Sequence, residues 1–446
     1  MSMNRMSLMG ADIKKRKDIV LLLFILYVTP LCIYLQSLFF ATTNAWGAVY
    51  ILMLIGLMLI NRRFSLQVKK TDVLLFVFIL IACFSSLRAG AYLYFMQALL
   101  VLLFVWGYTK YNLNDLYRYL DILIIFGIVC ALSCIIQEFW HGFFVDLITK
   151  LFKPQEVETI LRLEKNMGNC GIMPQTAHSA GSILNAFFIL MLKKSNIRRK
   201  LILGAILLVG LLFTGKRAHL FMGMLVFVIS FFIGLKGKKK IMTIVKSIIL
   251  TAILSNVLLL IVPFPPRDNT ISKGVYTITH FDIDDEDIMH GRQYLYSKAI
   301  MMGNSAPITG HGWGSFKNTV EYRDGHTDVH NIYLQLYAEQ GGIVLAMFIL
   351  SAFIIIYSNM TLLKKIKCKY HKQSEEIVLT KLALCFILFF YFYGLTGNPL
   401  YDIDYLIVFG VGVSIIKKMS SKGKSIGNSN IGSPNEKKII PYNPFV

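Results

Sequence analysis

Apolar runs separated by short polar segments make up most of the chain. Each run has roughly the 17 to 25 residues that a helix needs to cross the hydrocarbon core of a bilayer. About twelve such helices are predicted, near residues 19–40, 45–61, 71–87, 91–109, 119–139, 176–192, 201–216, 218–235, 241–263, 332–359, 382–396 and 403–416. The expected fold class is therefore an all-α polytopic membrane protein.

The composition supports this class. Hydrophobic residues make up 55% of the chain and charged residues only 16%, which excludes an ordinary soluble globular protein. The first apolar run has no small-residue cleavage site behind it, so we expect a retained helix and not a signal peptide.

The charge distribution predicts the orientation. With the N-terminus in the cytoplasm, 33 of the 46 Lys and Arg residues fall in inner segments, as the positive-inside rule requires. We interpret the basic clusters Lys14–Lys17 and Lys236–Lys240 as topology signals that can also contact anionic membrane lipids. They do not predict a nucleic-acid partner.

Two polar segments on the outer side interrupt the helical pattern. The predicted organisation has helices one to nine in 1–263 with an outer loop at 140–175, and a large extracytoplasmic loop with short helices at 264–329. Helices ten to twelve follow in 330–418, and a disordered cytoplasmic tail occupies 419–446. The outer loops are where function is expected.

No cofactor is predicted. The seven cysteines lie mostly in apolar runs without metal-ligand spacing, and His290, His311 and His326 lack spaced carboxylates or paired cysteines beside them. The glycines in Gly310–Gly314 lack the Lys-Ser/Thr ending of a phosphate-binding loop. The sequence therefore predicts neither a metal nor a nucleotide site.

The end of the large loop carries a candidate site. His330 stands at the mouth of the apolar stretch that begins at Ile343, and a titratable residue at a membrane edge indicates function. A histidine that caps the entering helix is the alternative. In a straight helix Glu339 would face away from His330, so Glu339 is expected to be structural, buried against an arginine or backbone donors. Gly342 would permit close helix packing.

Two further cationic positions precede it. Lys216 and Arg217 form a basic pair on the predicted outer side, against the orientation rule. The 14 residues of Leu201–Thr214 span about 21 Å, short of the ~30 Å core, so Arg217 should lie at or below the outer interface. A snorkelling arginine is the alternative. Arg292 opens an amphipathic helix. The alternative to a functional role is a solvated arginine at the helix start that pairs with the acidic run Asp284–Asp287.

The order of these motifs resembles the O-antigen ligase and polymerase superfamily over about residues 160–345. The motifs are Thr214-Gly215-Lys216-Arg217, Arg292, Gly310-x-Gly312-x-Gly314-x-Phe316, and His330-Asn331 with Glu339 and Gly342. Lys216 departs from the pattern, because many relatives have a serine at that position.

The resemblance implies a GT-C-like fold in the bacterial cytoplasmic (inner) membrane, with an active site that faces the periplasm. It implies a metal-independent glycosyltransferase for cell-envelope or capsule polysaccharide. The substrate would be an undecaprenyl-diphosphate-linked oligosaccharide, and the partners a chain-length regulator and a flippase. Arg217 and Arg292 would hold the donor diphosphate as its charge develops, and His330 would deprotonate the acceptor hydroxyl.

The other candidate residues surround this centre. Lys216, Trp313 and Tyr337 are expected to contact substrate, although ordinary loop packing is an equal alternative for Trp313. Gly310 and Gly312 are expected to form a turn under the site. Two other functions remain open: a ligase that transfers glycan to an acceptor such as lipid A core, and a non-catalytic flippase or transporter. Midplane charges and repeats would indicate the transporter, whereas the polar residues here gather in an outer loop.

Overall fold

The computed structural model describes residues 68–233 and 292–428, except 103–104, 107–112, 167, 174, 323–324 and 370–374. The predicted helices near 19–40, 45–61 and 241–263 lie outside the described residues, as do the acidic run and the end of the predicted tail.

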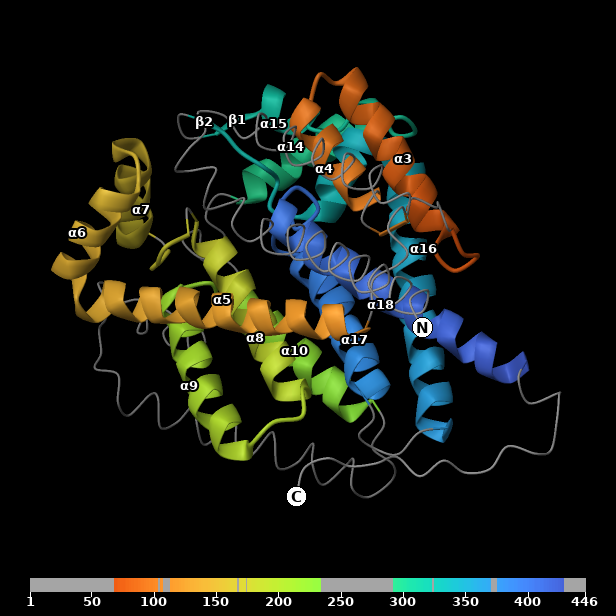
Figure 1. Cartoon of the computed structure of the whole chain (residues 1–446). Helices are drawn as coiled ribbons and strands as arrows, with labels where there is room; N and C mark the ends of the chain where they lie inside the picture. Colours follow the sequence, from red (N-terminus) through yellow and green to blue (C-terminus); the bar gives the residue numbers. More distant parts are fainter. Residues whose placement is uncertain are drawn as a thin grey trace, which may run out of the picture.

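The described part of the chain is almost entirely helical (Figure 1), which confirms the predicted all-α class. The helices are α3 (Val73–Arg88), α4 (Tyr92–Leu102), α5 (Leu113–Phe139), α6 (His141–Leu151), α7 (Pro154–Asn166), α8 (Thr176–Leu192), α9 (Ile197–Phe213), α10 (Arg217–Phe232), α14 (Arg292–Ser305), α15 (Ser315–Thr319), α16 (Ile332–Lys369), α17 (Glu375–Tyr393) and α18 (Ile403–Asn428). Two short strands, β1 (Glu321–Tyr322) and β2 (Gly325–His326), pair antiparallel between α15 and α16.

Three helices in the described residues are long and apolar enough to cross a membrane. They are Leu116–Phe139 within α5, Ile332–Lys367 within α16, and Glu375–Tyr393, which is α17. Shorter apolar helices occupy Val73–Arg88, Thr176–Leu192 and Arg217–Ser230. These segments fit an integral membrane protein, and the total of twelve spans stays a prediction.

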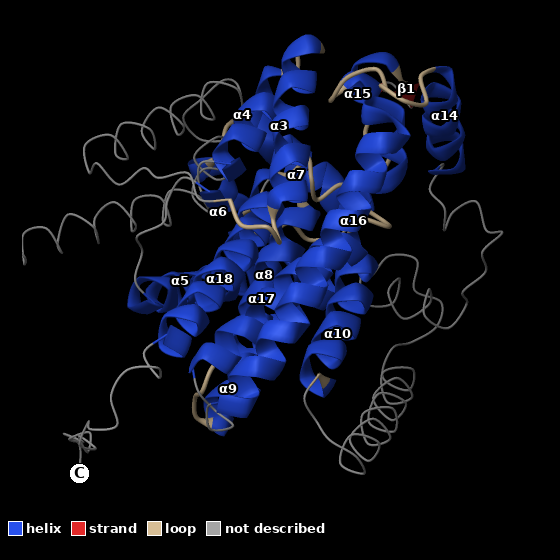
Figure 2. Cartoon of the chain, turned by 90° about the vertical axis from the view of Figure 1, so that its right-hand side faces the viewer, coloured by secondary structure: helices blue, strands red, loops and turns tan. Residues whose placement is uncertain are grey.

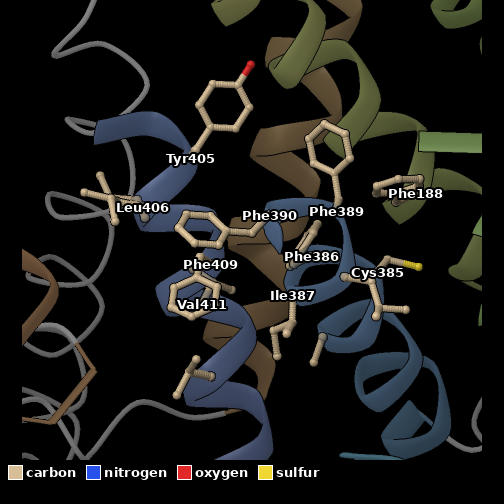
Figure 3. Packing of buried hydrophobic residues seen from close by; sticks show 14 of the residues in the cluster. Phe188, Cys385, Phe386, Ile387, Phe389, Phe390, Tyr405, Leu406, Phe409 and Val411 are labelled. Carbon is tan, nitrogen blue, oxygen red and sulfur yellow. The ribbon is translucent and has the colours of Figure 1, made fainter. Parts of the chain in front are cut away.

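The centre of the bundle is packed with aromatic side chains from α8, α17 and α18. Phe390 of α17 stacks on Phe409 of α18 with 4.3 Å between ring centroids, and Phe389 meets Phe188 of α8 edge-on at 6.1 Å (Figure 3). Because α17 is apolar around its whole circumference, it can be buried on all sides in the middle of the bundle.

The outward faces of the peripheral helices are also apolar. Ile202 of α9, Phe221 of α10 and Phe353 of α16 are exposed side chains of this kind. A water-soluble bundle would place polar residues there, whereas hydrocarbon is an apolar surrounding that these side chains can contact. The exposed surface therefore agrees with the composition.

Helix α16 is interrupted near its start. Gly341 has φ 78° and ψ 174°, so Ile332–Gln340 and the long segment after Gly341 are separate helical pieces. The apolar run at 332–359 predicts one continuous helix here, and the break is a departure from that prediction. Beside the first piece, α14 and α15 lie together at one end of the bundle (Figure 2).

Candidate active site

Three helix N-termini meet at the end of the bundle that also carries α14. Nδ1 of His178, in the first turn of α8, lies 2.9 Å from the Asp404 carboxylate at the start of α18. Nε2 of His219, in the first turn of α10, lies 2.5 Å from the hydroxyl of Tyr405 in α18. Helix N-termini carry a positive partial charge and free backbone N–H groups. This end of the bundle is therefore suited to an anion.

The cationic residues singled out from sequence lie at the same end. Lys216 precedes α10, Arg217 is its first residue, and Arg292 is the first residue of α14. Burial lowers the pKa of Lys216, and the charge of Arg292 lowers it further. Arg292 also lies within electrostatic range of Arg217. The fold thus brings together positive charges that are 75 positions apart in sequence.

Like charges held near one another disfavour the charged state unless an anion compensates them. Among the described residues, neither Arg217 nor Arg292 forms an ion pair. The acidic run Asp284–Asp287, which could pair with Arg292, lies outside the described residues. The arrangement could hold a multiply charged anion such as a diphosphate.

His330 has an unusual backbone conformation. Its φ of 59° makes it the only non-glycine residue with positive φ in the described part of the chain. Such a conformation is costly for a side chain with a Cβ and is found preferentially at functional sites. The residue lies just outside α16, which begins at Ile332. The helix-face comparison of His330 with Glu339 therefore does not apply, because His330 is not part of the helix.

Asn331, and not His330, caps this helix. The Asn331 side-chain oxygen accepts hydrogen bonds from the backbone N–H groups of Tyr333 at 3.0 Å and Leu334 at 3.1 Å. These are the contacts of a helix N-cap. The helix cap that was the alternative role for His330 is therefore made by Asn331, and the imidazole of His330 is available for another role.

The imidazole of His330 lies close to the cations. Partial removal from water lowers the pKa of His330, and the charges of Arg292 and Lys216 lower it further, while Asp328 opposes them. The residue keeps an exposed edge, which limits the first effect. Burial and the cations act in the same direction, so the neutral ring, which can accept a proton, is favoured.

Glu339 is fully buried and binds the glycine-rich turn. Its carboxylate accepts hydrogen bonds from the backbone N–H groups of Gly314 at 2.8 Å and Phe316 at 3.1 Å, and from the Tyr401 hydroxyl at 2.5 Å. These are backbone donors of the kind expected from sequence for a structural residue.

The turn lies across the break in α16. The break leaves the carbonyls of Ala338 and Glu339 without helical partners, and the N–H groups of His311 and Gly312 donate to them at 3.3 and 2.7 Å. A Cβ on Gly310 would stand 2.3 Å from the Glu339 carbonyl, at a φ of +61°. Gly342 donates to the Pro307 carbonyl at 2.7 Å. The glycines predicted to form a turn under the site therefore support the helix that follows His330.

Two residues predicted to contact substrate, Trp313 and Tyr337, also pack against protein. Trp313 is buried, with its ring 5.3 Å from that of Tyr401 and 6.1 Å from that of Phe78. The hydroxyl of Tyr337 donates to Asn304 at 2.8 Å, and its ring lies against Gly303 of α14. Loop packing, the alternative interpretation of Trp313, fits its buried ring, and the substrate contact of the half-buried Tyr337 stays a prediction.

Sequence reasoning missed a group of carboxylates and an imidazole within electrostatic range of Lys216. Burial raises the pKa of Asp402, with the carboxylates of Asp404 and Asp328 adding to the shift and His178 opposing it. His178 and Asp404 are 226 positions apart, and His178 stands in an apolar helix. The available signals were a histidine in an otherwise apolar run and the pair Asp402-Ile403-Asp404 directly before the last predicted span.

The fold and this site define an all-helical membrane protein with a cationic centre at one end of its bundle. Residues 202–349, about a third of the chain, match the model of a family described as O-antigen ligase. This match confirms the resemblance to the O-antigen ligase and polymerase superfamily. It includes Arg217, Arg292, His330 and Glu339, but not His178 or Asp404. No curated protein matches the chain.

Proposed function

We propose that this protein is a polysaccharide polymerase of a bacterial cytoplasmic membrane. It transfers a growing glycan from undecaprenyl diphosphate to the terminal sugar of a lipid-linked repeat unit, on the outer face of the membrane. The observation that supports this most directly is that Arg292 lies within electrostatic range of Lys216, Arg217 and His330, because this placement unites an anion site and a proton acceptor.

The donor diphosphate is held by Lys216, Arg217 and Arg292. Guanidinium groups bind phosphate oxygens through two parallel N–H donors and keep their charge at every physiological pH. Gln175 and Lys216, which precede α8 and α10, make no side-chain cap, so the first N–H groups of both helices add to the positive potential. These groups act most strongly on the leaving diphosphate, whose charge grows as the glycosidic bond breaks.

His330 activates the acceptor. The acceptor hydroxyl oxygen attacks the anomeric carbon of the donor sugar while its proton passes to the neutral imidazole. The bond from that carbon to the diphosphate oxygen breaks, and its electron pair leaves with undecaprenyl diphosphate. The positive-φ backbone of His330 and the Asn331 cap beside it fix the point from which the imidazole projects.

A ligase uses the same donor and the same chemistry with a different acceptor, such as lipid A core. The matching family is described as O-antigen ligase, which favours this as the second candidate. A flippase without catalysis would have no use for a neutral histidine beside the cations.

The test is incubation of the purified protein with a defined lipid-linked oligosaccharide, with and without chelator, followed by sizing of the products. We expect long chains from the native protein in both conditions. Arg217→Ala, Arg292→Ala and His330→Ala should each abolish them at normal protein level. Arg88→Ala, which alters an exposed arginine at the end of α3, should leave them intact. Unchanged chain lengths in all three site variants would refute the proposal.

A further inference from the structure

A second histidine stands at the cationic centre with a carboxylate behind it. His178 lies in the first turn of α8, and its Nδ1 is 2.9 Å from Oδ2 of Asp404. Both side chains are largely buried, with 10% and 15% of their surface exposed. A carboxylate at one ring nitrogen fixes the direction of the ring and compensates its charge when both nitrogens carry protons. The pair therefore presents the other nitrogen, Nε2, in a defined direction.

Nε2 of His178 is open. It forms no hydrogen bond within the described residues, and it is not fully enclosed by the protein. It therefore keeps accessible surface inside a largely buried side chain. His178 also lies within electrostatic range of Lys216 and of Asp402. Its free nitrogen is consequently available at the anion site and not at a distant face of the bundle.

His219 illustrates a different use of a histidine in the same region. It is fully buried, with its ring 4.3 Å from that of Tyr393 and 5.6 Å from that of Phe389, and its Nδ1 is enclosed without a partner. A ligand cannot reach it without rearrangement of the aromatic side chains. Of these two histidines, only His178 combines an orienting carboxylate with an open ring nitrogen.

We propose that His178 is a further donor-binding residue, whose Nε2–H donates a hydrogen bond to the lipid-linked diphosphate, and that Asp404 is its positioning residue. The inference rests on the proposed function, because it assigns one more residue to the same diphosphate. It also extends the site beyond residues 202–349, to α8 and α18.

Two amide substitutions separate binding from structure. In His178→Asn the amide can replace Nδ1 and keep the contact with Asp404, but nothing replaces Nε2. In His178→Gln the longer side chain can place its amide N–H where Nε2 stood. A ligand role predicts that Gln retains more function than Asn, whereas a purely structural role predicts the reverse order.

The experiment measures binding of undecaprenyl diphosphate and undecaprenyl monophosphate to the full chain in lipid nanodiscs, together with kcat and KM for a lipid-linked oligosaccharide. We expect His178→Asn to weaken diphosphate binding about 10- to 100-fold, the usual effect of one hydrogen bond to a charged group. Monophosphate binding should change less, and Gln should recover part of the loss. Asp404→Asn should raise KM for the donor more than it lowers kcat.

The matched control is His141→Asn. His141 forms a histidine–carboxylate pair with Glu164 at 3.2 Å between α6 and α7, and 55% of the His141 side chain is exposed. We expect normal binding and turnover from it. If His178→Asn does not fold, the ¹⁵N resonance of His178 in the native protein provides the measurement, and it should shift when undecaprenyl diphosphate is added.

The possible results separate the two proposals. A native protein that binds diphosphate and makes polymer, with normal affinity in His178→Asn or with no shift of the resonance, overturns the role of His178 alone. A native protein that neither binds diphosphate nor makes polymer overturns the proposed function itself.

Discussion

At the scale of single residues, two titratable groups nine positions apart in sequence have opposite surroundings. His330 is partly exposed and lies in a strained backbone conformation, and burial together with the charges of Arg292 and Lys216 lowers its pKa. Glu339 is enclosed and satisfied by backbone and hydroxyl donors. A group with an open edge and an adjusted pKa is suited to proton transfer, whereas a fully satisfied one is suited to holding structure. This difference assigns His330 to proton transfer and Glu339 to a structural role.

The pH dependence of turnover tests the first assignment. A general base is lost as the pH falls through its pKa, and the pKa of His330 lies below the ordinary histidine value of about 6.5. We therefore expect kcat/KM of the native protein to stay high as the pH falls past 6.5 and to decline only at lower pH. Lys317→Ala removes one of the cations that lower this pKa, so it should move the acid limb to higher pH. An acid limb that begins at or above pH 7 in the native protein would argue against His330 as the base.

At the scale of elements, the break in α16 and the glycine-rich turn form one unit. The turn satisfies the carbonyls that the break exposes, and Glu339 binds the N–H groups at the other end of the turn. The Ser85 hydroxyl of α3 also accepts hydrogen bonds from this unit, from the backbone N–H of Trp313 at 3.0 Å and from the side-chain amide of Gln340 at 2.9 Å. The first piece of α16, which follows His330, is therefore held from several sides.

Glu339→Gln tests this unit. Oε2 of Glu339 accepts from the Gly314 N–H and Oε1 accepts from the Phe316 N–H. An amide has one acceptor oxygen where the carboxylate has two, so one of these two buried backbone N–H groups loses its acceptor. We expect a loss of about 1 to 3 kcal/mol of stability, seen as a lower midpoint of thermal unfolding and a lower yield of folded protein. Turnover per folded molecule should change less. Glu158→Gln, on an exposed position of α7, is the control and should have no effect. The reverse pattern, with normal stability and lost turnover, would make Glu339 catalytic.

At the scale of the whole molecule, the local hydrophobic pattern predicted the helices but not the tertiary contacts between them. The apolar run at 176–192 coincides with α8, and the run at 332–359 begins where α16 begins, because hydrophobic length is a local property. The break at Gly341 depends on the turn that packs across it, and a pair of glycines in an apolar run also fits close helix packing. Asp404 and His178 meet only through the tertiary fold, so the local sequence around either residue does not reveal their contact.

The opposite end of the bundle supplies the last prediction. There Asp72, at the start of α3, accepts a hydrogen bond from the indole of Trp106 at 2.8 Å and pairs with Lys417 of α18 at 3.3 Å, with both charged side chains largely buried. This contact joins the first described helix to the last one. Removal of one partner leaves a buried charge uncompensated, which typically costs about 3 to 5 kcal/mol, whereas removal of both costs less.

Lys417→Met should therefore lower the midpoint of thermal unfolding more than the double variant Asp72→Asn with Lys417→Met does, and a double-mutant cycle measures the difference. Because the pair lies at the far end from the cationic centre, KM for the donor should stay unchanged in every variant that folds. Additive losses in the cycle would mean that the two charges do not stabilise one another. A raised KM would mean that the two ends of the bundle are coupled, since α18 carries both Lys417 and the Asp404 that positions His178.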